Sequence, residues 1–167
     1  MLSRKNKTLT IAPLMTIFSI VAIALSILPA CSSEPPGPVP LLENTTWVLE
    51  AYGQPDNLKS VLTGAGYGKD IKITTAFHKF NDTGGQVTGF SGVNTYWGDY
   101  KLEDNKISIS GIMLTTLGGP QPLMEQESEF IKLLGTAESY RIENSQLQIT
   151  CGQQILVFVQ QQQESKS

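Results

Sequence analysis

The sequence contains a single histidine, His78, and only two cysteines, Cys31 and Cys151. Transition-metal sites usually combine several His or Cys ligands, so we expect no metal centre and no cofactor. A Ser–His–acid triad would depend on His78 alone, and no Gly-x-Ser-x-Gly turn supports one. His78 is therefore interpreted as a residue near a strand end that is solvated or hydrogen-bonded to a neighbour.

The sequence also lacks a cluster of basic residues. It has 12 Lys and Arg against 15 Asp and Glu, a net charge of −3. Three of the basic residues and none of the acidic ones precede Cys31, so the rest of the chain has 12 − 3 = 9 basic and 15 acidic side chains, a net charge of −6. Phosphate backbones are bound by basic patches. Nucleic acid is therefore excluded as a partner.

Two glycine-containing segments lack the residues that would make them ligand sites. Gly64–Gly68 has no Lys-Ser/Thr pair after it, so it does not match a P-loop. Asn81–Gly85 lacks the acidic spacing and the closing Glu of an EF-hand. The first segment is interpreted as a flexible loop and the second as a hairpin turn.

The N-terminal part of the chain has the pattern of an export signal. Three basic residues precede an apolar run of 18 residues, Ile11–Leu28. This order is typical of a signal peptide, because the basic end stays in the cytoplasm while the apolar run enters the membrane. The run ends in Leu28-Pro29-Ala30-Cys31, which resembles the lipobox of prokaryotic lipoproteins, although Pro29 replaces the usual Ala, Ser, Thr or Val.

The lipobox resemblance implies that residues 1–30 are removed and that the Cys31 thiol carries a diacylglycerol. Two acyl chains on one cysteine anchor a protein stably, so the membrane is an expected partner through Cys31. The alternative is an uncleaved spanning helix, because 18 residues lie near the lower limit of about 17–25 for a span. In both cases the domain faces outside the cytoplasm, at the cell membrane or the outer membrane.

The rest of the chain is expected to form one globular domain, with 40% apolar and 16% charged residues in the whole sequence. Residues 31–41 contain the lipidated cysteine and a tether with four prolines, which should be stiff. The domain itself is expected over 42–160. Residues 161–167 are expected to form a disordered polar tail.

Strand patterns dominate the domain, and one helical pattern interrupts them. A helix is predicted over 122–134, with apolar residues on one face, Glu125, Glu127 and Glu129 toward its start, and Gly135 as a suitable C′ residue. These patterns predict an α+β domain whose mainly antiparallel sheet curls into a partial barrel. The predicted strands are 45–52, 71–77, 86–90, 96–102, 106–110, 140–142, 146–149 and 155–158.

The most distinctive segment is Phe90–Tyr100, in which Gly92-Val93-Asn94 precedes Tyr-x-Gly-x-Tyr. It resembles the signature of the META domain (HslJ-like) family of bacterial envelope and secreted proteins. Further marks of that family follow the same order, over about residues 41–160. They are an early Trp47, a strand ending at Phe80, the stretch Thr115–Leu117, an acidic helix with Phe130 and Leu133-Leu134, and a closing hairpin.

The cysteines depart from the family pattern. Many members carry one cysteine where this chain has Val93 and another near Gly119, and the resemblance implies that these two pair. Both are absent here, and Cys151 has no partner because Cys31 is expected to be lipidated. No disulfide is therefore predicted, and Cys151 is interpreted as a small, partly buried apolar residue.

The residues of the signature also suggest local structure. Gly92 and Asn94 tolerate positive φ, as a tight turn requires. Alternation along a strand places Tyr96 and Tyr100 on one face and Trp97 on the other, with Gly98 allowing a close approach of another group. Two interpretations stay open: the aromatic residues fill the core, or Tyr96, Trp97 and Tyr100 form a ligand-facing patch.

The family resemblance implies an envelope location and, for some members, a link to stress or antibiotic tolerance. We therefore expect a lipid-anchored, non-enzymatic protein that binds a protein or a small apolar ligand. One rival hypothesis is an envelope hydrolase whose carboxylates, such as Asp99 and Glu103, converge in the fold. Another is an inhibitor or chaperone of exported proteins.

Overall fold

The computed structural model describes residues 41–62 and 71–161. Several predicted features lie outside these residues: the signal peptide, Cys31, nearly all of the tether, the Gly64–Gly68 loop and the end of the tail. No helix in the described part is long and apolar enough to cross a membrane. Residues Pro35–Ser167 form one compact unit by their internal contacts. The core described below lies entirely within this unit. A unit with its own core is expected to fold independently.

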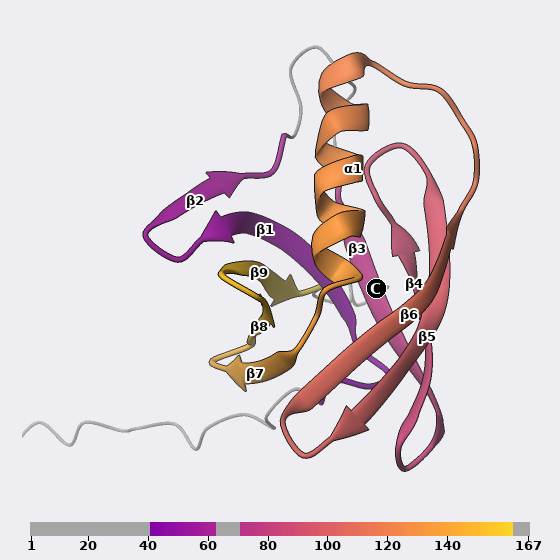
Figure 1. Cartoon of the computed structure of the whole chain (residues 1–167), viewed down its shortest axis with the longest axis vertical. Coiled ribbons are helices and arrows are strands. Elements are labelled where there is room, and N and C mark those ends of the chain that lie inside the picture. The colour runs from indigo at the N-terminus through magenta and orange to yellow at the C-terminus, as the bar shows by residue number, and fades with distance from the viewer. Residues whose placement is uncertain (1–40, 63–70, 162–167) are drawn as a thin grey trace, which may run out of the picture. The chain divides into compact units, whose positions relative to one another are not determined.

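The described residues form one nine-stranded sheet and one helix (Figure 1). All strand pairings are antiparallel, and the sheet curls so that β1 pairs with β9 as well as with β2 and β3. The predicted α+β architecture is confirmed. The elements are β1 (Thr46–Gln54), β2 (Asn57–Ser60), β3 (Thr74–Asn81), β4 (Gly84–Phe90), β5 (Thr95–Glu103), β6 (Lys106–Leu114), α1 (Gln121–Leu134), β7 (Ser139–Glu143), β8 (Gln146–Cys151) and β9 (Gln154–Gln160).

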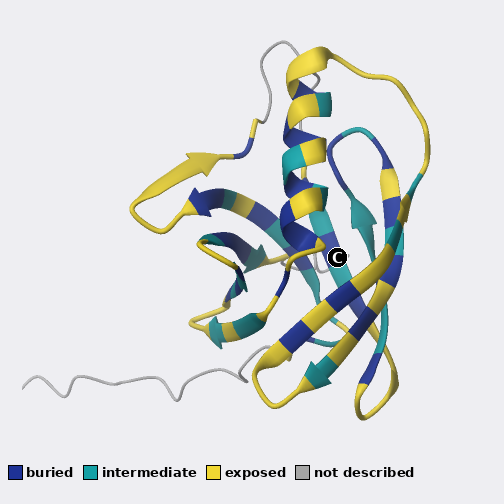
Figure 2. Ribbon diagram, viewed as in Figure 1, coloured by how far each residue is buried: buried dark blue, intermediate teal, exposed yellow. Residues whose placement is uncertain are grey.

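The core fills the inside of the curled sheet. Buried residues alternate with exposed ones along β5 and β6 (Figure 2), as period-two strands with one inward face require. Aromatic rings meet edge to face inside, with centroids 5.3 Å apart for Phe77 and Tyr100 and 5.7 Å apart for Tyr96 and Phe130. Because Phe130 belongs to α1, the helix packs against the inner face of the sheet.

Helix α1 confirms the predicted apolar face and the predicted end at Leu134, and it begins one residue before the predicted start. Its buried residues include the four that define that face, Leu123, Phe130, Leu133 and Leu134. The first turn contains no acidic residue, because the helix begins at Gln121. Gly135 ends the helix in a right-handed conformation, with φ −71°, so the position does not require glycine in the way a left-handed C′ residue does.

Strand β2 was not predicted, because all four of its residues are exposed and show no alternation. It pairs only with β1, and Lys59 binds Glu129 of α1 at 2.7 Å.

The predicted close approach at Gly98 is confirmed. Trp97 pairs with Met113 and Asp99 pairs with Ser110, so β6 has two residues opposite Gly98 in a β-bulge. A Cβ on Gly98 would lie 3.0 Å from the carbonyl oxygen of Ser110.

Candidate functional site

The signature turn Ser91–Asn94 joins β4 to β5. Gly92 has φ +104°, which confirms its predicted use of positive φ. Asn94 is not among the non-glycine residues with positive φ, so the prediction for this residue was wrong. The role of Asn94 comes from its hydrogen bonds instead.

Glu127 of α1 receives the hydrogen bonds of this turn. Its Oε2 accepts from the backbone nitrogen of Asn94 at 2.8 Å and from the hydroxyl of Ser91. Its Oε1 accepts from Asn94 Nδ2, also at 2.8 Å. Glu127 as a whole residue is 5% exposed. The helix dipole therefore does not explain the position of Glu127, and the interpretation made from the sequence was wrong for this residue.

The side chain of Asn94 also holds the segment that follows β6. Its Oδ1 accepts from Thr115 Oγ1 at 2.8 Å and from the Leu117 backbone nitrogen at 2.7 Å. Its Nδ2 donates a second bond to the Leu117 carbonyl at 3.2 Å. We call Ser91, Asn94, Thr115, Leu117 and Glu127 the Asn94 clamp. It joins three segments that are distant in the sequence.

The Asn94 clamp fixes a loop whose own side chains face solvent. Every residue of the loop Thr115–Pro120 is exposed (Figure 2). The Leu117 side chain is 64% exposed although both backbone groups of Leu117 bond to Asn94, and Met113, shortly before the loop, is 55% exposed. Large apolar side chains held outward on a fixed loop are suited to contact another molecule.

The clamp is poorly suited to catalysis. Among the described residues, Ser91 has the only hydroxyl that contacts the Glu127 carboxylate, and Ser91 is 0% exposed. A nucleophile must reach a substrate, and Ser91 is enclosed. The clamp therefore acts as a structural hydrogen-bond network.

The buried role of Glu127 was not predicted, although the spacing of this residue carries a signal. Glu127 lies four positions after Leu123 and three before Phe130, so it belongs to the apolar face of the helix. A carboxylate on such a face needs buried hydrogen-bond donors.

The predicted aromatic patch is not brought to one surface. Tyr96 and Tyr100 are buried in the core, while Trp97 is half-buried on the other face of β5. The Tyr96 hydroxyl lies 2.7 Å from Thr75 Oγ1, and the Tyr100 hydroxyl donates to Glu43 at 2.7 Å. Burial raises the pKa of both tyrosines. The core interpretation therefore applies to Tyr96 and Tyr100.

The remaining candidate residues are His78 and Cys151, and their environments indicate structural roles. His78 is exposed, and its Nε2 lies 2.9 Å from Thr88 Oγ1. Cys151 is unpaired and buried, and burial, with a smaller effect of Glu138, raises its pKa to about 12. Within residues 41–62 and 71–161 no group of three His, Cys, Asp or Glu side chains is arranged to hold a metal ion.

The sequence model of the META domain family matches residues 40–163. The chain belongs to the META domain family. The family marks noted in the sequence meet in space, because the Asn94 clamp joins the signature turn, the threonine-containing stretch and the acidic helix. No curated protein sequence matches the chain significantly.

Solved structures share the META domain fold. An NMR structure of a protein from Burkholderia xenovorans is 24% identical, with a TM-score of 0.58, and the match covers 81% of this chain and 98% of that one. A crystal structure of a DUF4847 family protein from Bacteroides vulgatus is 18% identical, with a TM-score of 0.51, covering 74% and 97%. These similarities extend to the fold alone.

The structure also brings together the two positions where many META domains carry cysteines. A Cβ on Gly119 would lie 3.7 Å from the Cβ of Val93. Disulfide-bonded cysteines have a mean Cβ–Cβ distance of about 3.8 Å. The Cβ separation at positions 93 and 119 therefore lies within the range found in disulfides.

Proposed function

We infer that this META domain protein is exported, anchored by a lipid on Cys31, and acts by binding another molecule rather than by catalysis. The observation that carries the binding role is the Asn94 clamp, which uses buried polar groups to hold the exposed loop Thr115–Pro120. Leu117 on this loop and Met113 before it form the proposed contact surface. An apolar surface suits a partner that is another exported protein, which this domain would inhibit or protect from aggregation. The proposed setting of this role is stress or antibiotic tolerance.

The positions of the carboxylates favour binding over hydrolysis. Asp99 and Glu103 are both exposed on the outer face of β5. Four positions along a strand span about 13 Å, whereas the catalytic carboxyl groups of glycosidases lie about 5–9.5 Å apart. Glu103 and Glu138 line a common groove, but both are exposed. Neither pair has the buried arrangement that tunes an acid and a base.

The binding role can be tested with matched variants. The unit Pro35–Ser167 is immobilised, incubated with envelope extract, and compared with Leu117→Ser and Leu58→Ser. Leu58 is an exposed leucine on β2, outside the clamp and its loop. We expect a partner that binds the wild type and the Leu58 variant but is lost from the Leu117 variant. Recovery of the same proteins with all three, or of none with the wild type, would contradict the proposal.

The anchor is tested separately, by labelling cells with radioactive palmitate. Full-length wild type should incorporate the label and Cys31→Ala should not, because the thiol of Cys31 is the proposed attachment point. Absence of label from the wild type would favour the uncleaved spanning helix instead.

A further inference from the structure

Two large apolar side chains project into solvent where the chain enters the domain and at the β3–β4 hairpin. Leu41 is 73% exposed and Phe80 is 71% exposed, the highest values for large apolar side chains within residues 41–62 and 71–161. Single exposed apolar residues are common on protein surfaces. The positions of these two residues therefore decide what they can do.

Phe80 is turned outward by a β-bulge. The register of β3 against β4 shifts between Lys79 and Asn81, which leaves Phe80 as the extra residue of the bulge. Bulges re-aim side chains near strand ends. The residues opposite are Gly84 and Gly85, which have no side chains to cover Phe80. The hairpin is therefore built to hold this ring in the open.

The chain enters the domain beside the same hairpin. Glu43 forms a bridge with Phe77 of β3, and Asn44 N donates to the Phe77 carbonyl at 2.9 Å. The Glu43 carboxylate accepts from the Tyr100 hydroxyl at 2.7 Å and lies 3.7 Å from Lys79 Nζ. Phe77 and Lys79 belong to the half of β3 that leads into the hairpin. These contacts therefore fix the entry of the chain at the hairpin end of the domain.

The length of the chain limits how far this end can lie from the proposed anchor. Leu41 follows Cys31 by 41 − 31 = 10 positions. Ten residues span at most about 36 Å. A tether of this length keeps the hairpin end at a high effective concentration near the membrane. A weak apolar contact is then sufficient to hold the domain against the bilayer.

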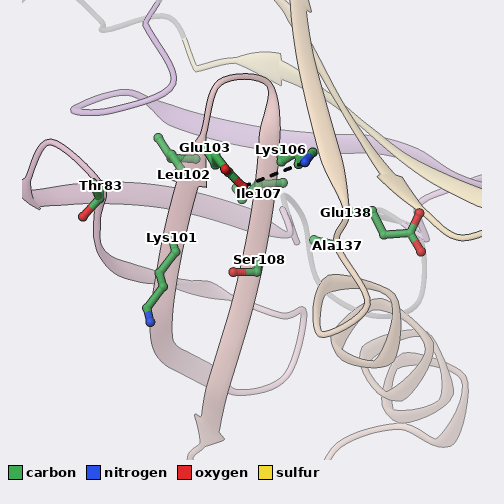
Figure 3. A pocket seen from close by; sticks show the side chains of 9 residues that line it. All are labelled: Thr83, Lys101, Leu102, Glu103, Lys106, Ile107, Ser108, Ala137 and Glu138. Carbon is green, nitrogen blue, oxygen red and sulfur yellow. Dashed lines mark ion pairs between the residues drawn. The ribbon is translucent and has the colours of Figure 1, made fainter.

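The charges at this end balance. The β5–β6 hairpin tip is hydrogen-bonded to the β3–β4 turn, and residues 79–82 and 101–106 together contain three Lys and three Asp or Glu. Lys106 Nζ lies 3.9 Å from a Glu103 carboxylate oxygen (Figure 3). A surface without net charge has no electrostatic preference for an anion or a cation. The exposed apolar side chains are therefore its main binding feature.

We propose that this end of the domain rests on the lipid bilayer, with Phe80 and Leu41 in the interfacial layer. Apolar side chains gain free energy when they leave water for this layer. The inference rests on the proposed lipid anchor at Cys31, which brings the domain to the membrane. Because the charges balance, the contact does not require anionic lipids.

This orientation leaves the surface proposed for the partner accessible. Strand β4 runs from the hairpin beside Phe80 to the signature turn, and its seven residues span about 20 Å. The β3–β4 hairpin and the loop Thr115–Pro120 accordingly lie at opposite ends of the domain (Figure 1). With Phe80 at the membrane, Leu117 faces away from it.

The test supplies the lipid chemically. Residues 31–167, which contain the folded unit, are coupled through Cys31 to a maleimide lipid in phosphatidylcholine vesicles. Cys151 is 4% exposed, so the reagent reaches Cys31 selectively. Bromine atoms on the acyl chains quench a tryptophan that enters the bilayer. Because the anchor is attached in vitro, the result does not depend on whether cells add a lipid to Cys31.

Two single variants place the added tryptophan at opposite ends. Phe80→Trp should lose emission in brominated vesicles and shift its emission to the blue. Leu117→Trp replaces a similarly exposed side chain, at 64%, and should keep its emission. The wild type, treated in the same way, gives the signal of the two native tryptophans for subtraction. Equal quenching of the two variants, or quenching of neither, would overturn the proposal.

A second comparison separates membrane contact from mere nearness to the anchor. Leu41→Trp should also be quenched, and adding Phe80→Glu should restore most of its emission, because a carboxylate is costly to place in the interface. Adding Leu58→Glu instead, on exposed strand β2, should leave the quenching unchanged. Quenching that does not respond to Phe80→Glu would show that Phe80 does not hold the domain on the bilayer.

Discussion

Asn94 and Glu127 are 33 positions apart in the sequence, yet the backbone and side-chain nitrogens of Asn94 both donate to the Glu127 carboxylate at 2.8 Å. This pair joins the turn between β4 and β5 to α1. Because the same Asn94 side chain holds Leu117, one residue sets the relative positions of the turn, the helix and the exposed loop.

Replacing Glu127 with glutamine should destabilise the domain. The amide is nearly the same size as the carboxylate, but its NH₂ group would face a donor of Asn94 or Ser91. A buried donor left without an acceptor costs about 1–3 kcal/mol, which urea unfolding would measure. Glu125→Gln is the matched control, since Glu125 is exposed and should change stability by less than about 0.5 kcal/mol. Equal stability of the two variants would argue against the clamp.

Restoring cysteines at positions 93 and 119 should create a disulfide. The Cβ distance of 3.7 Å lies within the range for a disulfide. The oxidised Val93→Cys, Gly119→Cys protein should gain about 3 kcal/mol, lost again on reduction, because the bond closes a loop in the unfolded chain. Thiol titration tests whether the bond forms, and thermal unfolding measures the gain in stability. The single variant Val93→Cys is the control. Two persistent free thiols at these positions would show that the distance is wrong.

Gly89 should not tolerate a side chain. A Cβ there would collide with the Thr74 carbonyl oxygen and the Tyr96 ring, and both are fixed in the core. Gly89→Ala should cost about 3 kcal/mol through overpacking. Gly118→Ala should be neutral within about 0.5 kcal/mol, because no atom of the described residues lies within 4 Å of its added Cβ. Urea unfolding of both variants compares them directly.

Cys151 should make the domain sensitive to alkaline pH. Its pKa is raised from 9.0 to about 12 by burial, and less strongly by Glu138. Above the unfolded pKa the unfolded chain loses this proton while the folded chain keeps it, so stability falls as pH rises from 9 toward 12.

The test compares unfolding free energies at two pH values. Between about pH 8 and about pH 10.5 the wild type should lose about 2 kcal/mol more than Cys151→Ala. Equal losses would mean that the thiol is not protected. The buried Tyr96, whose pKa burial also raises, is present in both proteins and cancels in the comparison.

The sequence predicted the parts of the fold that depend on local patterns. Alternation of residues was sufficient to predict strand β5, and the apolar spacing of Leu123, Phe130 and Leu134 was sufficient to predict helix α1. Strand β2 was missed, because an exposed strand has no buried face to mark it.

The site depended more strongly on contacts that the sequence does not display. The Asn94 clamp was missed because a glutamate in a helix resembles a surface residue until its partner, 33 positions away, is known.

The most direct test of the clamp is amide hydrogen exchange at Leu117 in the wild type and in Asn94→Ala. The Leu117 nitrogen donates to Asn94 Oδ1 at 2.7 Å, so its proton should exchange slowly in the wild type. In Asn94→Ala we expect fast exchange at Leu117 while core amides such as that of Ile149 stay protected. Fast exchange in the wild type, or slow exchange in both proteins, would show that Asn94 does not hold the loop.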